Sequence, residues 1–321
     1  MRQVFVKALC GLAAADERIL LLTGDLGYMA LEPFRDSFPA RFFNVGVAEQ
    51  NLIGMVAGLA EAGFRPYAYS IATFAALRPF EFIRNGPVLH RLPVRIAGMG
   101  MGFTYGHAGP SHHALEDIAA LRTLPALTVV IPADSAQASA AMEQTAALPG
   151  PVYYSLSKDD RAVVPDLKGR FELGRVQIVR EGADVAIVSM GSISTEAVAA
   201  ALELETYGIQ ASVAVVSNFN PDPVEDLAGL LGGVPHVISV EAQTLSGGLA
   251  SLVGVVIASR GLSCRLWPLA VRTSPDGLSG SEPDCWRRHG LDRRAIVDCG
   301  LSIFGGPARC ARASYSGRPS E

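Results

Sequence analysis

The segment NVGVAEQNLIGMVAGLAEAGFRPYAYSIAT, residues 44–73, contains a helix pattern followed directly by a strand pattern. Apolar residues recur at helical spacing from Leu52 to Leu59, and Gly63 predicts the end of the helix. The run RPYAYSIAT is typical of a buried strand. One acid, Glu49, stands at the start of the helix. It is either an idle first-turn carboxylate, stabilised by the positive helix terminus, or a buried acid held for chemistry, and its position alone favours the first.

The same alternation of strand and helix patterns extends over most of the chain. Continuous apolar strands joined by helices are what a parallel sheet with both faces covered requires. Strands are expected at RILLLTGD, RPYAYSIAT, VRIAGMG, LTVVIPA, VYYSLS, DVAIVSMG, ASVAVVSNF, HVISVEA and RLWPLAV. Helices are expected near 47–62, 79–90, 113–123, 135–147 and 195–207, and after the SGG at 246–248.

These patterns predict an α/β protein of two domains, each a mostly parallel sheet flanked by helices. The segment 158–182 interrupts the alternation with charges, Pro and Gly, and we interpret it as a linker region that carries a small hairpin. We therefore expect a first domain at 1–165, a linker at 166–182 and a second domain at 183–310. The small polar end of the chain, 311–321, is expected to be disordered.

The composition argues against several kinds of partner. The chain has 321 residues, of which 49% are hydrophobic and 18% charged, so much of it must be buried in two cores or against another subunit. A net charge of -4 gives no reason to expect binding to nucleic acid or to a membrane. Five Cys without a CxxC pair favour a reducing cytoplasm. The first 20 residues have no long apolar core, so no signal peptide or membrane anchor is expected.

Ligands of open α/β sheets bind outside the carboxyl ends of the strands. This rule selects TGDLG, YSIATF and, above all, GMGMGFTYGHAGPSHHALED at 98–117. The last segment is rich in Gly, which allows the backbone to approach a ligand closely, and it holds His107, His112 and His113. The chain has no dinucleotide fingerprint, phosphate loop, helical zinc pair or GxSxG elbow.

Together these segments resemble a known family. Residues 42–74, followed by GHAGPSHHALEDIAALRTLPALTVVIPAD at 106–134, look like the pyrimidine-binding domain of thiamine-diphosphate enzymes, with transketolase and deoxyxylulose-phosphate synthase as the most similar types. ADVAIVSMGS, VISVEAQTLSGGLASLVG and HGLD resemble the C-terminal domain of the same enzymes. The resemblance covers nearly the whole chain.

The resemblance implies a chemical role for Glu49. In this family the matching acid bonds the N1′ atom of the aminopyrimidine of thiamine diphosphate, which favours loss of the C2 proton and formation of the nucleophilic ylid. The cofactor supplies the chemistry and the protein tunes it. An acid can do so only when it is held close and dry, because water competes for the hydrogen bond. The resemblance therefore changes our interpretation of Glu49 to a buried, catalytic acid.

The resemblance also implies cofactor contacts for other residues. Phe74 matches the aromatic residue that stacks on the aminopyrimidine, and Phe80 is expected to help line the same pocket. Asp25 matches an acid near the thiazolium and a subunit interface. His112 matches a catalytic histidine that contacts the donor ketose, while His113 stands where the family usually has Gln. No metal ligand is expected on this chain.

Basic residues are expected to contact the sugar-phosphate substrate. Arg2 stands 23 residues before Asp25, which is the family's interval for one such residue. Lys158 stands where the family has Arg, and a Lys neutralises a phosphate without forming the planar bidentate fork. Met29 replaces a Ser that helps to hold the acceptor phosphate. These two changes predict weaker recognition of a phosphorylated acceptor.

The histidine loop departs from the family at its acidic positions. Transketolases usually read GEDGPTH, and their Asp recognises a hydroxyl group of the sugar. This chain reads GHAGPSH, with His107 and Ala108 in place of the two acids. We expect this loss to relax the preference for α-hydroxylated aldehyde acceptors.

Complete enzymes of this type carry a diphosphate-binding domain, with GDG followed some residues later by Asn, that holds Mg²⁺. Gly24-Asp25-Leu26 with Asn51 has a similar spacing, but the third residue is Leu and Asn51 lies in the pyrimidine-site helix, so we reject this match. We therefore predict that the chain is the C-terminal, β-type subunit of a split transketolase. Its expected partner is an N-terminal diphosphate-binding subunit that holds Mg²⁺, in an α2β2 heterotetramer.

The expected reaction is transfer of a two-carbon ketol unit from a ketose donor to an aldehyde acceptor. One alternative is a decarboxylating subunit like deoxyxylulose-phosphate synthase or the β-type chain of a 2-oxoacid dehydrogenase, although GPSHH and LEDIAALR favour transketolase over the dehydrogenase. Another is a non-catalytic relative, which would be expected to lose Glu49 or Phe74. The second domain is expected to serve contacts and architecture. The helix start after Gly247-Gly248 could bind an anion, but a structural role is favoured.

Overall fold

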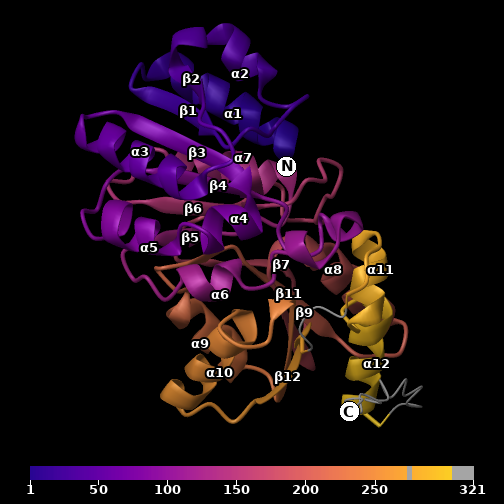
Figure 1. The fold of residues 1–321 in the computed structure, drawn as a ribbon. Helices are drawn as coiled ribbons and strands as arrows, with labels where there is room; N and C mark the ends of the chain where they lie inside the picture. The colour runs from indigo at the N-terminus through magenta and orange to yellow at the C-terminus, as the bar shows by residue number, and fades with distance from the viewer. Residues whose placement is uncertain (273–276, 306–321) are drawn as a thin grey trace, which may run out of the picture.

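The computed structural model describes residues 1–272 and 277–305, which form two helix-flanked sheets (Figure 1). Both sheets are mostly parallel, so the predicted fold class is confirmed. Within the described residues no helix is both long and apolar enough to cross a membrane. The tail that was predicted to be disordered, 311–321, lies outside the described residues.

The first domain is built on a seven-stranded sheet of order β10-β5-β6-β4-β3-β1-β2. Its neighbouring strands are parallel, except that β10 runs antiparallel to β5. The strands are β1 (Ile19–Thr23), β2 (Phe42–Asn44), β3 (Arg65–Ile71), β4 (Arg95–Met99), β5 (Thr128–Val130), β6 (Val152–Leu156) and β10 (Asn218–Phe219). The helices are α1 (Arg2–Ala15), α2 (Glu32–Ser37), α3 (Glu49–Glu61), α4 (Ala72–Leu77), α5 (Phe80–Ile83), α6 (Asp117–Leu121) and α7 (Ser135–Thr145).

Helices cover both faces of this sheet. Successive strand residues point to opposite faces, so Leu21 and Leu22 of β1 belong to different cores. Leu22 packs with the buried side of α3, and Leu21 packs with α1 and α7. Every residue of β1, β4 and β6 is buried, which explains why their sequences are mostly apolar. The buried Arg95 of β4 donates its hydrogen bonds to backbone carbonyl groups.

The second domain has a five-stranded sheet of order β12-β11-β8-β9-β7. Its strands are β7 (Val176–Arg180), β8 (Val185–Ser189), β9 (Ala211–Val216), β11 (His236–Thr244) and β12 (Arg265–Val271). Its helices are α8 (Ser194–Glu205), α9 (Val224–Gly232), α10 (Leu249–Arg260), α11 (Glu282–Arg288) and α12 (Arg293–Ile303). The hairpin predicted within 158–182 is wrong, because β7 pairs instead with the distant β9, antiparallel, at the edge of this sheet.

Two other predicted boundaries also differ from the structure. The helix expected from 113 begins only at Asp117, because Ala114 is extended and bridges Met101 and Gly102. The single strand expected at ASVAVVSNF divides at Ser217 into β9, in the second sheet, and β10, in the first. The second half of the chain therefore supplies an edge strand to the first domain.

The start of α10 is occupied by a carboxylate of the chain itself. Glu241 accepts hydrogen bonds from the backbone N–H groups of Leu249, at 2.7 Å, and Ala250, at 2.9 Å. Burial raises the pKa of Glu241 to about 7. A Cβ atom on Gly248 would lie 1.9 Å from the carboxylate, so the close approach requires Gly. This segment thus has a structural role, and its helix terminus already has an anionic partner.

Candidate active site

The carboxyl ends of β1, β3 and β4 lie side by side, and the segments that follow them converge. The segment after β3 is α4, which contains Phe74, and the segment after β4 is the histidine loop, residues 100–116. The ring centroids of Phe74 and His112 are 5.1 Å apart. The structure therefore brings together two of the segments that the strand-end rule selected.

Glu49 lies at the same edge of the sheet and is only 2% exposed, although it is the first residue of α3. The Ser70 hydroxyl donates to one carboxylate oxygen, Oε1, at 3.1 Å. The Arg78 Nη1 donates to the other, Oε2, at 2.9 Å. A buried carboxylate is costly unless it is paired and hydrogen-bonded, and these two donors compensate for the loss of water.

Arg78 also contacts the aromatic wall of the site. Its guanidinium carbon lies 3.9 Å from the centroid of the Phe74 ring, while 43% of its side chain is exposed. One planar cationic group thus stacks on Phe74 and bonds Glu49 at its edge. The arrangement places a flat apolar surface beside a buried carboxylate.

The histidine loop contacts Phe74 through His112. Its short turns are Gly106–Ala108 and Pro110–His112. The His112 ring lies 6.5 Å from the Tyr105 ring, centroid to centroid, and its Nδ1 is 3.0 Å from the Ser111 hydroxyl. The Lys158 Nζ lies 5.4 Å from the centroid of Tyr105. Neighbouring side chains thus form a path of contacts from Phe74 past His112 and Tyr105 to the cation of Lys158.

The remaining predicted site residues lie around this path. Asp25 is exposed and accepts hydrogen bonds from Asn44 Nδ2, at 2.7 Å, and the Tyr28 hydroxyl, at 2.9 Å, which lower its pKa. Arg2 begins α1, and its charge lowers the pKa of Tyr105, although burial raises that pKa more strongly. The three other predicted positions are His107 and Ala108, which are exposed on the loop, and Phe80, which packs against the α3 core.

Comparison with known proteins identifies the family of this fold. A transketolase pyrimidine-binding domain model matches residues 1–162, and a transketolase C-terminal domain model matches residues 174–296. The chain belongs to the transketolase family. A solved structure described as a split gene transketolase, inactive beta4 tetramer, is 35% identical and superposes with a TM-score of 0.85, over 95% of this chain and 98% of that one.

Curated transketolase relatives match along most of their own length. One subunit of the apulose-4-phosphate transketolase of Phocaeicola vulgatus is 31% identical over 94% of this chain and 96% of its own. A subunit of a 6-deoxy-6-sulfo-D-fructose transketolase from Clostridium sp. is 34% identical over 78% of each chain. The two relatives are named for different sugars, apulose 4-phosphate and 6-deoxy-6-sulfo-D-fructose.

The transketolase C-terminal domain holds the histidine loop in place, which the sequence analysis did not predict. The Thr104 hydroxyl donates to Glu282 Oε1 at 3.1 Å, and the Ser192 hydroxyl to the same oxygen at 3.4 Å. His289 stacks on Phe103, with ring centroids 4.9 Å apart. A cavity of about 730 Å³ opens beside Glu282, between the two domains. The second domain therefore contacts the loop that carries His112.

Burial of Glu282 predicts a pH-dependent stability. Desolvation raises the pKa of Glu282 from its ordinary 4.5 to about 7, so the folded chain binds more protons than the unfolded chain between these values. The stability contributed by protonated Glu282 is therefore lost as pH rises from about 4.5 to 7. We expect Glu282→Gln to raise the melting temperature at pH 8 but not at pH 4.5, as measured by thermal denaturation. Glu61→Gln changes an exposed acid and is the control, so it should leave the melting temperature unchanged at both pH values. If Glu282→Gln melted at the wild-type temperature at pH 8, burial of the Glu282 carboxylate would not destabilise the fold.

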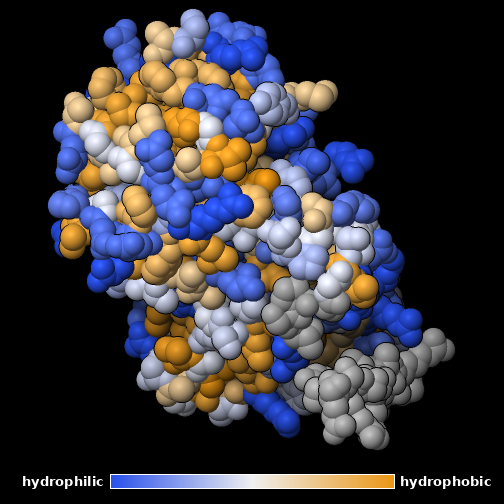
Figure 2. Space-filling view, viewed as in Figure 1, coloured by the Kyte–Doolittle hydropathy of each residue, from blue (hydrophilic) through white to orange (hydrophobic). Residues whose placement is uncertain are grey.

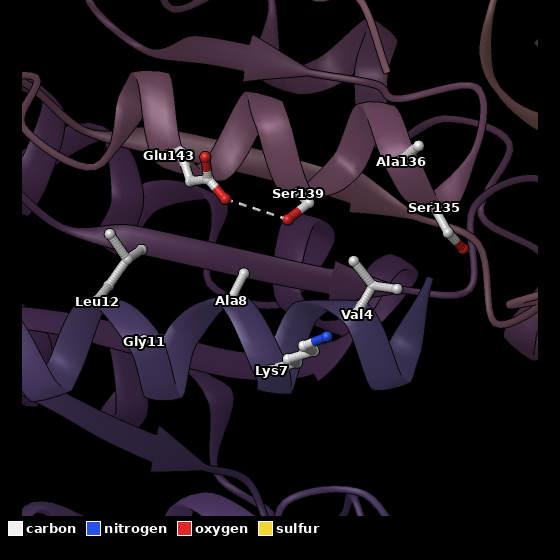
Figure 3. Close-up of a pocket in the computed structure, with 9 residues that line it drawn as sticks. All are labelled: Val4, Lys7, Ala8, Gly11, Leu12, Ser135, Ala136, Ser139 and Glu143. Atoms are coloured by element: carbon white, nitrogen blue, oxygen red, sulfur yellow. Dashed lines mark hydrogen bonds between the residues drawn. The ribbon is translucent and has the colours of Figure 1, made fainter. Parts of the chain in front are cut away.

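A groove between α1 and α7 is not part of this site. Figure 3 shows its lining of small and apolar residues from the two helices, with Lys7 and Glu143 at its sides. The helices α1 and α7 pack on the core that contains Leu21, whereas α3 packs on the opposite face. The sheet therefore separates this groove from Glu49.

Proposed function

We propose that this chain is the β-type subunit of a split transketolase, which transfers a two-carbon ketol unit from a ketose donor to an aldehyde acceptor. The observation that carries the proposal is the buried carboxylate of Glu49 beside the Phe74 ring, within reach of the histidine loop. The relatives named as transketolase subunits support it.

The residues around Glu49 fit the aminopyrimidine of thiamine diphosphate. Such a ring needs a flat apolar surface and, at its edge, a carboxyl group that shares a proton with N1′. Arg78 bonds Glu49 while it lies over Phe74, so one planar group can reach both. Bound there, the cofactor would supply a carbon nucleophile that protein side chains lack. Glu49 would hold a proton at N1′, Phe74 would support the face of the ring, and burial would keep water from the hydrogen bond.

The path beyond Phe74 suits an anionic, hydroxylated substrate. His112 is partly exposed beside Phe74 and Tyr105, where its ring can bond a substrate hydroxyl. Lys158 supplies an exposed positive charge at the end of this path, and Arg2 lies near Tyr105. We therefore assign His112 to the donor ketose and Lys158 with Arg2 to its charged end.

We infer that a diphosphate-binding subunit completes the site in an α2β2 heterotetramer. We assign the Mg²⁺ ligands to the partner, because complete enzymes of this family carry them on the diphosphate-binding domain. Exposed apolar residues surround Asp25 and the start of α3, with Tyr28 69%, Met29 89% and Val47 71% exposed. The β4 tetramer of the structural relative is described as inactive, which supports a requirement for a second subunit. The cytoplasmic location stays a prediction.

Co-purification tests the proposed function. We expect this chain together with a diphosphate-binding subunit, thiamine diphosphate, Mg²⁺ and a ketose donor to transfer a ketol unit to an aldehyde, and either chain alone to be inactive. Product formation is measured by chromatography. Release of carbon dioxide from pyruvate without ketol transfer would instead favour a decarboxylating enzyme. The absence of both reactions from a folded complex would favour a non-catalytic relative.

Acceptor preference provides a second test. Because Ala108 is exposed on the histidine loop and stands where transketolases carry Asp, we expect the wild type to use aldehydes without an α-hydroxyl efficiently. Ala108→Asp restores a carboxylate that can accept a hydrogen bond from an α-hydroxyl, so it should move kcat/KM toward hydroxyaldehydes by about tenfold. Ala108→Asn, which has a similar volume without the charge, is the matched control. An unchanged ratio in Ala108→Asp would show that the loop does not read the acceptor.

A further inference from the structure

Arg78 contacts both Glu49 and Phe74, the two residues to which the pyrimidine ring is assigned. It follows α4 directly, and its side chain folds back over Phe74 to reach Glu49. In the described part of the chain, Glu49 is its only hydrogen-bond partner. Its side chain is 43% exposed, so the guanidinium has open space on one side.

The guanidinium occupies the place where a pyrimidine ring would have to bind. It is planar, it donates an N–H to Glu49 Oε2, and it stacks on the Phe74 ring at 3.9 Å. Because one small group makes both contacts, Oε2 of Glu49 and the covered face of Phe74 adjoin the same space. A second planar group that bonds Oε2 and stacks on this face needs the same volume. Ser70 donates only to the other oxygen, Oε1, and need not move when a ligand replaces Arg78.

We propose that the Arg78 side chain competes with the pyrimidine ring of the cofactor for contact with Glu49 and Phe74, an inference that rests on the proposed function. The ring of the cofactor enters when the Arg78 side chain swings outward toward solvent. Glu49 Oε2 then exchanges the Arg78 N–H for a proton that it shares with the ring nitrogen N1′ and that is taken up from solvent on binding, so Oε2 never remains buried and unpaired. The observed affinity for the cofactor is lowered by the fraction of molecules in which Arg78 holds the site.

Thiamine binding to the full-length chain tests this competition, because thiamine carries the pyrimidine without the diphosphate. The dissociation constant is measured by ligand-detected NMR titration. We expect Arg78→Ala to bind thiamine about tenfold more tightly than the wild type, given the usual strength of a half-exposed ion pair combined with a cation–π contact. Arg78→Lys keeps the charge but not the planar stack, so it should give an intermediate value and should fold even if Arg78→Ala does not.

Two controls assign the effect to this site. Arg84→Ala removes an exposed guanidinium that, among the described residues, bonds only Asn85, and it should leave thiamine binding unchanged. Adding Glu49→Gln to Arg78→Ala should remove the gain. Equal or weaker binding by both Arg78 variants, with binding by the wild type, would overturn the competition and leave the proposed function intact. Absence of binding in the wild type and in all variants would overturn the pyrimidine site itself.

Discussion

Glu49→Gln is expected to reduce ketol transfer by the assembled enzyme by about a hundred- to ten-thousandfold, the range that a positioned acid or base contributes. The amide has the shape of the carboxylate, so its oxygen can accept from Arg78 while its NH2 group donates to the Ser70 hydroxyl. Arg78 therefore keeps its acceptor and Ser70 changes from donor to acceptor, so the fold should persist. What the amide lacks is the negative charge that stabilises a proton at the ring nitrogen of the cofactor.

The measurement is kcat for ketol transfer at saturating thiamine diphosphate and Mg²⁺, so that weaker cofactor binding does not imitate a chemical defect. Circular dichroism confirms that the variant is folded. Glu61→Gln changes an exposed acid at the other end of the same helix and should retain full activity. If Glu49→Gln kept more than about a tenth of the activity, Glu49 would not hold the proton, because general acid–base groups contribute more than that.

The parts of the fold that could be predicted from sequence are those with a strong local pattern. Every residue of the strands β4 and β6 is buried, so each is a mostly apolar segment between turns. The helix α1 was not predicted, since no side chain caps its start and its stability depends on packing against α7. The pairing partner of β7 could not be predicted either, because the strand pattern does not specify which distant strand will lie beside it.

The residues of the candidate site also differ in whether a local sequence pattern could predict them. Glu49, Phe74 and His112 belong to short motifs, and the structure places all three at one edge of the first sheet. Arg78 was not among the predicted site residues, because its contact with Glu49 depends on how the chain turns after α4. Glu282 is 178 residues from Thr104 along the chain, and such a pair leaves no periodicity that a sequence analysis could detect.

Met55→Glu is expected to prevent assembly with the diphosphate-binding subunit and to lower activity more than a hundredfold. Met55 is 38% exposed on the outer side of α3, next to Phe43, which is 41% exposed on the edge strand β2. Figure 2 shows apolar side chains gathered around β1 and α3 on the first domain. An apolar hollow of about 350 Å³ lies there, lined by Leu22, Phe43, Gly54, Met55, Gly58 and Leu59. Since a Cβ on Gly54 or Gly58 would meet nothing within 4 Å, this side of α3 leaves room for close approach by a partner.

A carboxylate at position 55 is harmless while α3 faces water, but burial without a partner costs several kcal/mol, which exceeds a hundredfold loss of affinity. The isolated variant should therefore fold normally and fail only in assembly, as sedimentation velocity of the mixed subunits would show. Leu202→Glu places the same charge on a 49% exposed apolar residue of α8, in the other domain, and should leave the complex intact. Normal assembly of Met55→Glu would place the partner on another surface. Failure of both variants would mean that added negative charge, rather than this side of α3, opposes association.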